Sequence, residues 1–189
     1  MIKVIFFGTP GFVLPVAQSL LEAKNLKLAA VVTAPDKPVG RKKITTPSPV
    51  KIWAKTHKTK IFDSSSIIRI IEQIKVIKPA VGVLAAYGKI IPQNLIDIFP
   101  KGILVIHPSL LPKYRGASPV QAALTCGEKE TGVSVILMDE KVDHGPILWQ
   151  IKEKISSEDT ALSLYQRLFN LAAENLPEIR VLHFSVRPR

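Results

Sequence analysis

Short apolar runs alternate along this chain with segments whose apolar residues recur at helical spacing. The runs predict buried strands at residues 2–7, 28–32, 80–85 and 103–106. The helical pattern appears at residues 13–23, 64–75, 118–125 and 157–175. Buried parallel strands that alternate with helices need cover on both faces. This order therefore predicts an α/β protein with a Rossmann-like, doubly wound, mostly parallel sheet.

Two segments near the end of the chain follow a different period. Residues 131–138 and 147–155 alternate apolar with polar side chains, which predicts an antiparallel pair of strands near the C-terminus. Residues 33–49 show neither period and are rich in Pro, Lys, Arg and Thr. We expect an irregular loop there, and a loop of that length in a compact domain is either functional or disordered.

Length and composition limit the class of protein. A chain of 189 residues with 47% hydrophobic and 22% charged residues fits one globular domain. No apolar run approaches the roughly 20 residues of a membrane span, so we expect no membrane partner. The single cysteine, Cys126, has no internal disulfide partner, which fits a reducing cytoplasm, and we expect it to be a small core residue.

The charge balance is strongly basic, with 26 Lys+Arg against 15 Asp+Glu and a formal net charge of +11. Part of this charge lies in the predicted loop, where Arg41, Lys42 and Lys43 follow Gly40. Such a cluster can follow a phosphate backbone, and it can equally be a solvated loop that aids solubility. Charge alone leaves both interpretations open.

One histidine stands where catalytic groups are expected in such a sheet. His107 follows the apolar run at 103–106 and begins a loop that Pro108 and Pro112 restrict. Asp143 lies in a turn between the two alternating segments. A carboxylate beside an imidazole orients the ring and favours its protonated, positively charged form. A charged imidazole can donate to an oxygen that becomes negative during acyl transfer. The sequence alone does not bring the two together, and a lone histidine at a strand end is often structural.

The signature at residues 106–116, Ile-His-Pro-Ser-Leu-Leu-Pro-Lys-Tyr-Arg-Gly, resembles that of the folate-dependent formyltransferases. The resemblance is strongest to the branch that formylates initiator methionyl-tRNA. It extends in order and spacing over most of the chain, through residues 8–12, 34–38, 46–51, 86–90 and 131–133. It implies the formyltransferase fold and N10-formyltetrahydrofolate as co-substrate, with no metal.

The resemblance also implies roles for individual residues. His107 and Asp143 match two of three catalytic positions, while Val105 stands where the family carries an asparagine. The folate-binding positions that match are Ser109, Leu110, Leu111 and Pro112, with Tyr87 and Gly88 expected to line the same pocket. Spacing typical of a metal site is missing around the remaining histidines, so we expect no metal ligands.

For the basic loop, the resemblance implies that Arg41, Lys42 and Lys43 bind the acceptor end of the tRNA. The family pattern there is Gly-Arg-Gly-Lys-Lys, and this chain omits the second glycine. We expect residues 1–176 to form the catalytic domain, 177–189 to form an atypical tail, and the C-terminal β-barrel of longer family members to be absent. We expect a cytoplasmic monomer.

The valine at position 105 leaves open whether the chain transfers formyl groups at the full rate of the family. Asparagine offers an amide N–H to the developing oxyanion, and loss of one such donor costs about 10²–10³ in rate. Either formyl transfer is impaired or another donor occupies that space. The alternative functions are a non-catalytic remnant that binds folate or tRNA, and a formyltransferase that acts on another small amine.

Overall fold

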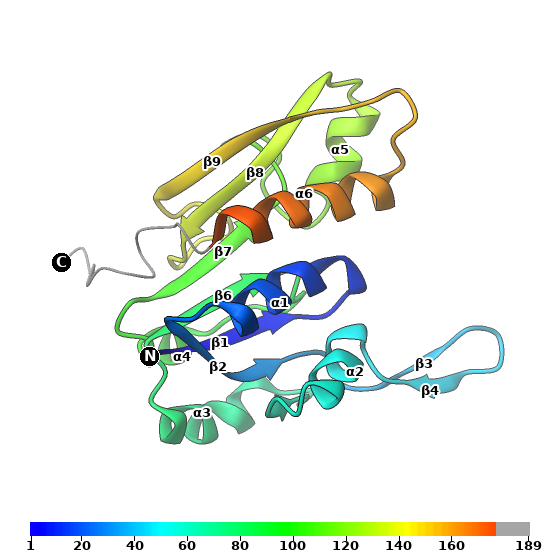
Figure 1. Ribbon diagram of the computed structural model, residues 1–189. Helices are drawn as coiled ribbons and strands as arrows, with labels where there is room; N and C mark the ends of the chain where they lie inside the picture. The colour runs from blue at the N-terminus through cyan, green and yellow to red at the C-terminus, as the bar shows by residue number, and fades with distance from the viewer. Residues whose placement is uncertain (177–189) are drawn as a thin grey trace.

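Seven strands form one sheet in the order β5-β2-β1-β6-β7-β8-β9 in the computed structural model, which describes residues 1–176 (Figure 1). The five strands β1, β2, β5, β6 and β7 are parallel, whereas β8 runs antiparallel to both β7 and β9. Their bounds are β1 Ile2–Gly8, β2 Leu26–Val32, β5 Ile61–Phe62, β6 Val81–Ala85, β7 Ile103–His107, β8 Glu130–Leu137 and β9 Ile147–Lys154. The predicted parallel sheet and antiparallel pair are confirmed, and the predicted tail at 177–189 lies outside the described residues.

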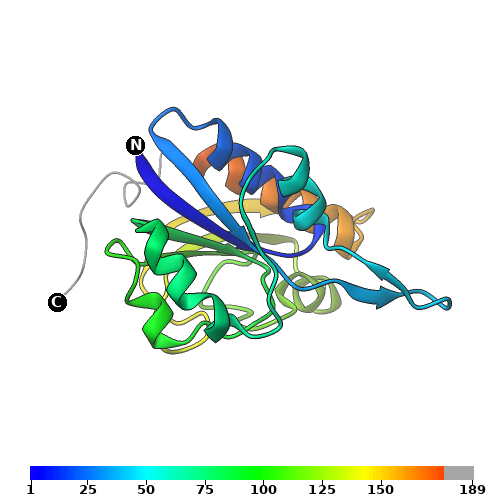
Figure 2. The ribbon, with the colours of Figure 1, turned by 90° about the horizontal axis from the view of Figure 1, so that it is seen from below.

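Helices cover both faces of the sheet, because the strands of its centre are apolar on both sides (Figure 2). On β1, Val4 and Phe6 belong to one buried cluster, and Ile5 and Phe7 belong to the other. The first cluster includes residues of α1 (Leu14–Glu22), α2 (Pro49–Thr56), α5 (Pro119–Thr125) and α6 (Ala161–Asn175). The second includes residues of α3 (Ile71–Ile77) and α4 (Gln93–Ile96).

Local signals explain where the helices begin. Ser48 caps α2 by accepting a hydrogen bond from the Lys51 backbone N–H, with Pro49 at the first helical position. Thr160 and Ser163 form a capping box at the start of α6. The helix predicted at 64–75 begins later than expected, as the 3-10 helix η2 (Ile67–Ile70) followed by α3. The apolar stripe that predicted it is buried as expected, at Ile67, Ile70, Ile71 and Ile74.

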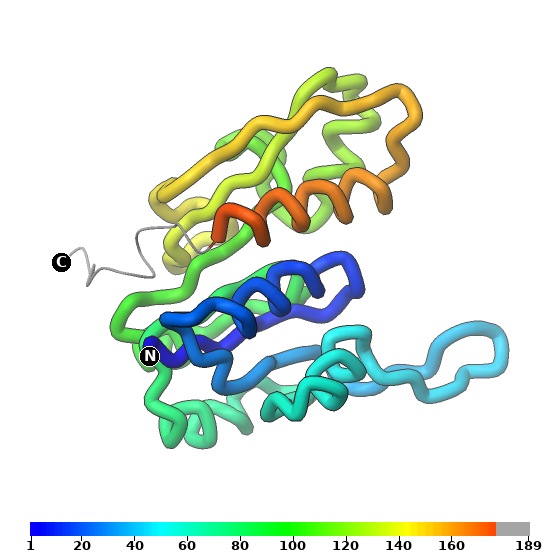
Figure 3. The backbone as a smooth tube through the Cα atoms, in the orientation of Figure 1, coloured from blue at the N-terminus to red at the C-terminus, as the bar shows by residue number. Residues whose placement is uncertain are grey.

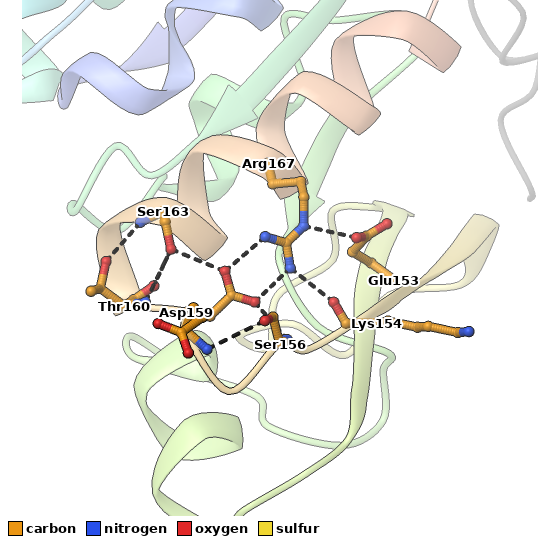
Figure 4. Close-up of polar contacts among 8 residues, drawn as sticks. Glu153, Lys154, Ser156, Asp159, Thr160, Ser163 and Arg167 are labelled. Atoms are coloured by element: carbon orange, nitrogen blue, oxygen red, sulfur yellow. Dashed lines mark hydrogen bonds and ion pairs between the residues drawn. The ribbon is translucent and has the colours of Figure 1, made fainter.

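Helix α6 is also joined to β9 by a polar cluster around Arg167 (Figure 4). The guanidinium donates to both carboxylate oxygens of Asp159 at 2.7 Å and to Glu153 at 2.8 Å. The Asp159 side chain is only 4% exposed. Hydrogen bonds from Arg167 are the main reason that the pKa of Asp159 is lowered, against the opposing effect of burial.

The segment expected to be an irregular loop contains an antiparallel hairpin, formed by β3 (Lys37–Val39) and β4 (Ile44–Thr46). This expectation was wrong because the hairpin is exposed on both faces and therefore lacks an apolar alternation. The hairpin projects from the body at the edge where the parallel strands end (Figure 3). Its base is held by Lys51, whose ammonium contacts Asp36 at 2.6 Å and Asp63 at 2.5 Å.

Two further findings concern single features. Cys126 is exposed at the end of α5, so the expectation of a core cysteine was wrong. The residue ends a short helix at the surface, where Gly127 closes the helix in a left-handed conformation. None of the helices in residues 1–176 combines the length and the apolar character needed to cross a bilayer.

Candidate active site

The carboxyl ends of β1, β6 and β7 meet at one edge of the sheet. The chain leaves β1 in one direction toward β2 and later returns to its other side as β6, which makes β1 and β6 the point where the strand order reverses. Ligands bind at such a point in open α/β sheets. Gly8 ends β1 there, and an added Cβ would lie 2.7 Å from the Phe6 ring and 3.1 Å from the Ala85 carbonyl oxygen. The glycine thus allows close packing of the two strand ends.

His107 is the last residue of β7, and the structure brings it to Asp143 as predicted. Nδ1 of His107 lies 3.3 Å from Oδ2 of Asp143, with the two side chains 5% and 12% exposed. On the other side of the ring, Nε2 donates to the backbone carbonyl of Tyr114 at 2.8 Å. Both ring nitrogens therefore face oxygen acceptors, a carboxylate on one side and a backbone carbonyl on the other.

The turn that carries Asp143 is tied to the loop after the histidine. The Gly116 N–H donates to Asp143 Oδ2 at 2.9 Å, and Nε of Arg115 donates to the Asp143 carbonyl at 3.0 Å. Asp143 has a φ of +50°, which a non-glycine residue rarely adopts. These contacts fix the carboxylate against the imidazole.

Two adjoining cavities open beside this pair. The first, of about 380 Å³, is lined by groups that include His107, Asp143, Val105, Tyr87 and Gly88. The second, of about 370 Å³, shares Val105, Gly88 and Asp143 and continues between Ile91, Met138 and Asp139. Each is large enough for part of a drug-sized ligand, and their lining is mostly apolar with a few polar groups, as ligand pockets usually are.

The wall at Val105 is apolar. Val105 is 7% exposed and packs with Leu111 and Ile136, with Leu84 and Met138 against the same cluster. Its strand neighbours in register are Leu84 on β6 and Ile136 on β8. Among the described residues of this cluster, no side chain replaces the amide that the family asparagine would supply.

Tyr87 and Gly88 follow β6 and line the first cavity, and their contact with folate stays a prediction. The Tyr87 side chain is buried, and within residues 1–176 its hydroxyl has no hydrogen-bond partner. Burial raises the pKa of Tyr87 to about 12, so the phenol stays protonated and can donate.

The structure does not place the segment Ser109–Pro112 in the lining described for either cavity. It lies behind the residues that line the cavities, where Leu111 packs against Val105. The segment is held by Ser134, whose hydroxyl donates to the Ser109 carbonyl at 2.6 Å and accepts from the Leu111 N–H at 3.0 Å. Folate contact through Ser109, Leu110, Leu111 and Pro112 stays a prediction.

Sequence reasoning missed Ser134 and Gln150, which support that segment. Nε2 of Gln150 donates to the Leu111 carbonyl and to Ser134 Oγ, both at 2.8 Å. Ser134 is fully buried in the middle of β8. The available signal was a serine between Val133 and Val135, in the apolar half of the strand, since buried hydroxyls need partners.

The basic residues Arg41, Lys42 and Lys43 occupy the exposed turn between β3 and β4. Gly40 and Lys43 both have positive φ, at 71° and 47°, and the Lys43 N–H closes the turn on the Gly40 carbonyl at 3.1 Å. The three cations are thus presented to solvent at the tip of a hairpin. Across the chain as far as residue 176, no three His, Cys, Asp or Glu side chains gather in a possible metal site.

Fold and site together define an α/β protein with a ligand site at the carboxyl edge of a parallel sheet, built around a paired imidazole and carboxylate. The sequence profile of the Formyl transferase family matches residues 2–179, and the chain belongs to that family.

Similar proteins agree with this assignment. The chain is 41% identical over 191 residues to a methionyl-tRNA formyltransferase of Thermus thermophilus, covering 99% of this chain and 62% of that protein. It is 44% identical to a methionyl-tRNA formyltransferase of Methylacidiphilum infernorum, covering 92% and 55%. The chain thus spans somewhat more than half the length of these relatives. A crystal structure of phosphoribosylglycinamide formyltransferase from Bacillus halodurans superposes with a TM-score of 0.78 at 24% identity, covering 96% and 93%, which shows the shared fold.

Proposed function

We propose that this chain transfers a formyl group from N10-formyltetrahydrofolate to the α-amine of initiator methionyl-tRNA. The observation that carries the proposal is the buried pair of His107 and Asp143 beside an open, ligand-sized cavity. Membership of the Formyl transferase family supports the reaction type. Relatives named methionyl-tRNA formyltransferase, at 40–44% identity, support the tRNA as acceptor.

The cavities fit a folate. Their apolar walls at Val105, Ile136 and Met138 suit a flat heterocycle, while Gly88 and Asp139 bring polar backbone or side-chain atoms to the same space. Bound N10-formyltetrahydrofolate supplies an already activated one-carbon unit, so the transfer needs no redox step. The amine nitrogen bonds to the formyl carbon, the bond to N10 breaks, and an amine proton replaces the formyl group on N10.

His107 supplies charge stabilisation in this scheme. As the amine attacks, the formyl oxygen gains negative charge, and we place it within reach of the imidazole. Its Nε2–H, which donates to the Tyr114 carbonyl, is then shared with that oxygen. Asp143 faces the opposite nitrogen, where its carboxylate orients the ring and places a negative charge beside it.

The hairpin supplies affinity for the tRNA. Arg41, Lys42 and Lys43 stand at its exposed tip, and the hairpin extends beyond the carboxyl edge of the parallel strands (Figure 1). Residues at the carboxyl ends of β6 and β7, such as Gly88 and His107, line the cavities. Cations on an extended arm can follow a phosphate backbone while the amine end of the substrate enters the cavity.

One observation favours a second candidate, a protein that binds folate or tRNA without turnover. The apolar cluster at Val105 offers no donor in place of the family asparagine. The two candidates differ in a single assay, in which protein, N10-formyltetrahydrofolate and methionyl-tRNA are mixed and the blocked α-amine is measured. Formylation that His107→Ala abolishes supports the enzyme, whereas binding of tRNA without formylation refutes it. Glycinamide ribonucleotide in place of methionyl-tRNA tests the small-amine alternative.

A further inference from the structure

The last three residues of the signature, 114–116, touch the histidine and the aspartate at three points. The Tyr114 carbonyl accepts from His107 Nε2, the Gly116 N–H donates to Asp143 Oδ2, and Arg115 Nε donates to the Asp143 carbonyl. We call residues 114–116 the strap. Because it holds both members of the pair, its position sets the geometry of the site.

The strap is itself fixed from outside the site. The Tyr114 hydroxyl donates to Oε1 of Glu128 at 2.6 Å, and the Lys113 ammonium contacts the same oxygen at 3.2 Å. The hydrogen bond to Glu128 is the first cause of a raised pKa at the Tyr114 phenol, and the same bond is the first cause of a lowered pKa at Glu128. A short bond between a phenol and a carboxylate is a strong, charge-assisted one.

The backbone of Tyr114 shows that this anchoring is needed. Its φ is +57°, a left-handed conformation that is unusual for a bulky residue. Such a conformation persists only where the surroundings determine it. Here the carbonyl is bound on one side by His107 and the side chain on the other by Glu128, and no glycine occupies the position.

We infer that Tyr114 and Glu128 are positioning residues for His107. The chain of contacts runs from Glu128 through the Tyr114 side chain to its carbonyl, and from there to the imidazole. It holds the Nε2–H aimed at the Tyr114 carbonyl, while Asp143 faces Nδ1 on the other side of the ring. Neither residue lies among those that line the two cavities, so their effect is exerted through His107.

The first test observes the imidazole directly, by proton and nitrogen NMR of the histidine side chains with His107→Ala used for assignment. We expect the wild-type Nε2–H of His107 to be hydrogen-bonded and slow to exchange. Tyr114→Phe and Glu128→Ala are expected to speed its exchange at least tenfold. Glu128→Gln keeps an acceptor oxygen for the phenol and is expected to stay near wild type. Unchanged exchange in Tyr114→Phe and Glu128→Ala overturns the inference.

Lys113→Met is the matched control, because it removes the other partner of Glu128 and leaves the phenol bond in place. Its side chain is 68% exposed. We expect its Nε2–H exchange to match wild type, and an effect as large as that of Tyr114→Phe overturns the inference.

The second test uses formyl transfer and therefore rests on the proposed function. Loss of a partner that orients a metal-ligating histidine lowers activity by about 10–100-fold, and we expect the same range for the orientation of His107. We expect kcat to fall by that factor in Tyr114→Phe and Glu128→Ala, with the KM for methionyl-tRNA unchanged. In Glu128→Gln, kcat should be largely restored. A rise in KM alone contradicts a positioning role. If the wild type forms no product, the proposed function fails, and the NMR measurement still decides the inference.

Discussion

Val105 and His107 are alternate residues of β7, and both line the cavity of about 380 Å³. Side chains at such positions point to the same face of a sheet. A donor at position 105 would therefore point toward the same space as the imidazole. The apolar side chain at this position is consequently the feature of the site that most affects its chemistry.

Replacing this valine tests that relationship. Val105→Asn is expected to raise the single-turnover rate of formyl transfer by about 10²-fold, because an amide N–H joins His107 in stabilising the negative oxygen. It is also expected to lower the free energy of unfolding by about 1–3 kcal/mol, since the amide is buried among Leu111 and Ile136 without a partner. Val105→Leu matches asparagine in size without a donor and should not raise the rate. Equal rates for Val105→Asn and wild type would refute the missing-donor account.

The pairing of Asp143 with His107 gives a second prediction. Asp143→Asn keeps an oxygen that can accept from the Gly116 N–H, so the turn should stay in place. It removes the negative charge that faces the imidazole, and we expect kcat to fall by about 10²–10⁴-fold. Thermal unfolding and the KM for methionyl-tRNA should change little. A variant that retains more than a tenth of wild-type kcat would show that the carboxylate is dispensable.

Much of the fold could be predicted because the central strands of its sheet are buried on both faces. Strands β1 and β7 contain the apolar runs Val4–Phe7 and Ile103–Ile106, and α6 shows a helical stripe with a capping box. The β3–β4 hairpin and the two-residue strand β5 escaped prediction for a physical reason. They are exposed or very short, so no periodic apolar pattern marks them.

The site was predictable in part. The strand-end histidine and the resemblance located His107 and Asp143, and the structure shows the contact between them. The strap was not predictable, because its main contact to the imidazole is a backbone carbonyl and its anchor, Glu128, lies in another segment. Every residue has a backbone carbonyl, so no residue type in the sequence marks the carbonyl that accepts from the imidazole.

The exposed hairpin gives a third prediction. Replacing Arg41, Lys42 and Lys43 together by Gln is expected to raise the KM for methionyl-tRNA, because three phosphate contacts are lost. Each lost contact lowers the slope of log K against log salt by about 0.7–0.9, so the slope should fall by about 2–3. Binding titrations between low and physiological salt measure this.

The matched control for the hairpin changes the same number of charges elsewhere. Lys24, Lys27 and Lys78 are exposed at the amino edge of the parallel strands, opposite the hairpin. Their joint replacement by Gln removes the same net charge and should leave the KM and the salt slope near wild type. If both triple variants weaken binding equally, the effect is one of net charge and the hairpin has no special role.

The Arg167 cluster predicts a pH-dependent contribution to stability (Figure 4). Because Arg167 lowers the pKa of Asp159 below its unfolded value of about 3.9, the pair stabilises the fold above that pH and loses its effect as pH falls through the folded-state pKa. Arg167→Met should lower the free energy of unfolding at pH 7 by about 1–3 kcal/mol. In urea titrations the difference from wild type should shrink below pH 4. Lys75→Met, which breaks an exposed pair with Glu72, should cost about 0.5 kcal/mol or less. A deficit in Arg167→Met that is the same at pH 7 and pH 3 would show that packing of the long side chain, and not its charge, joins α6 to β9.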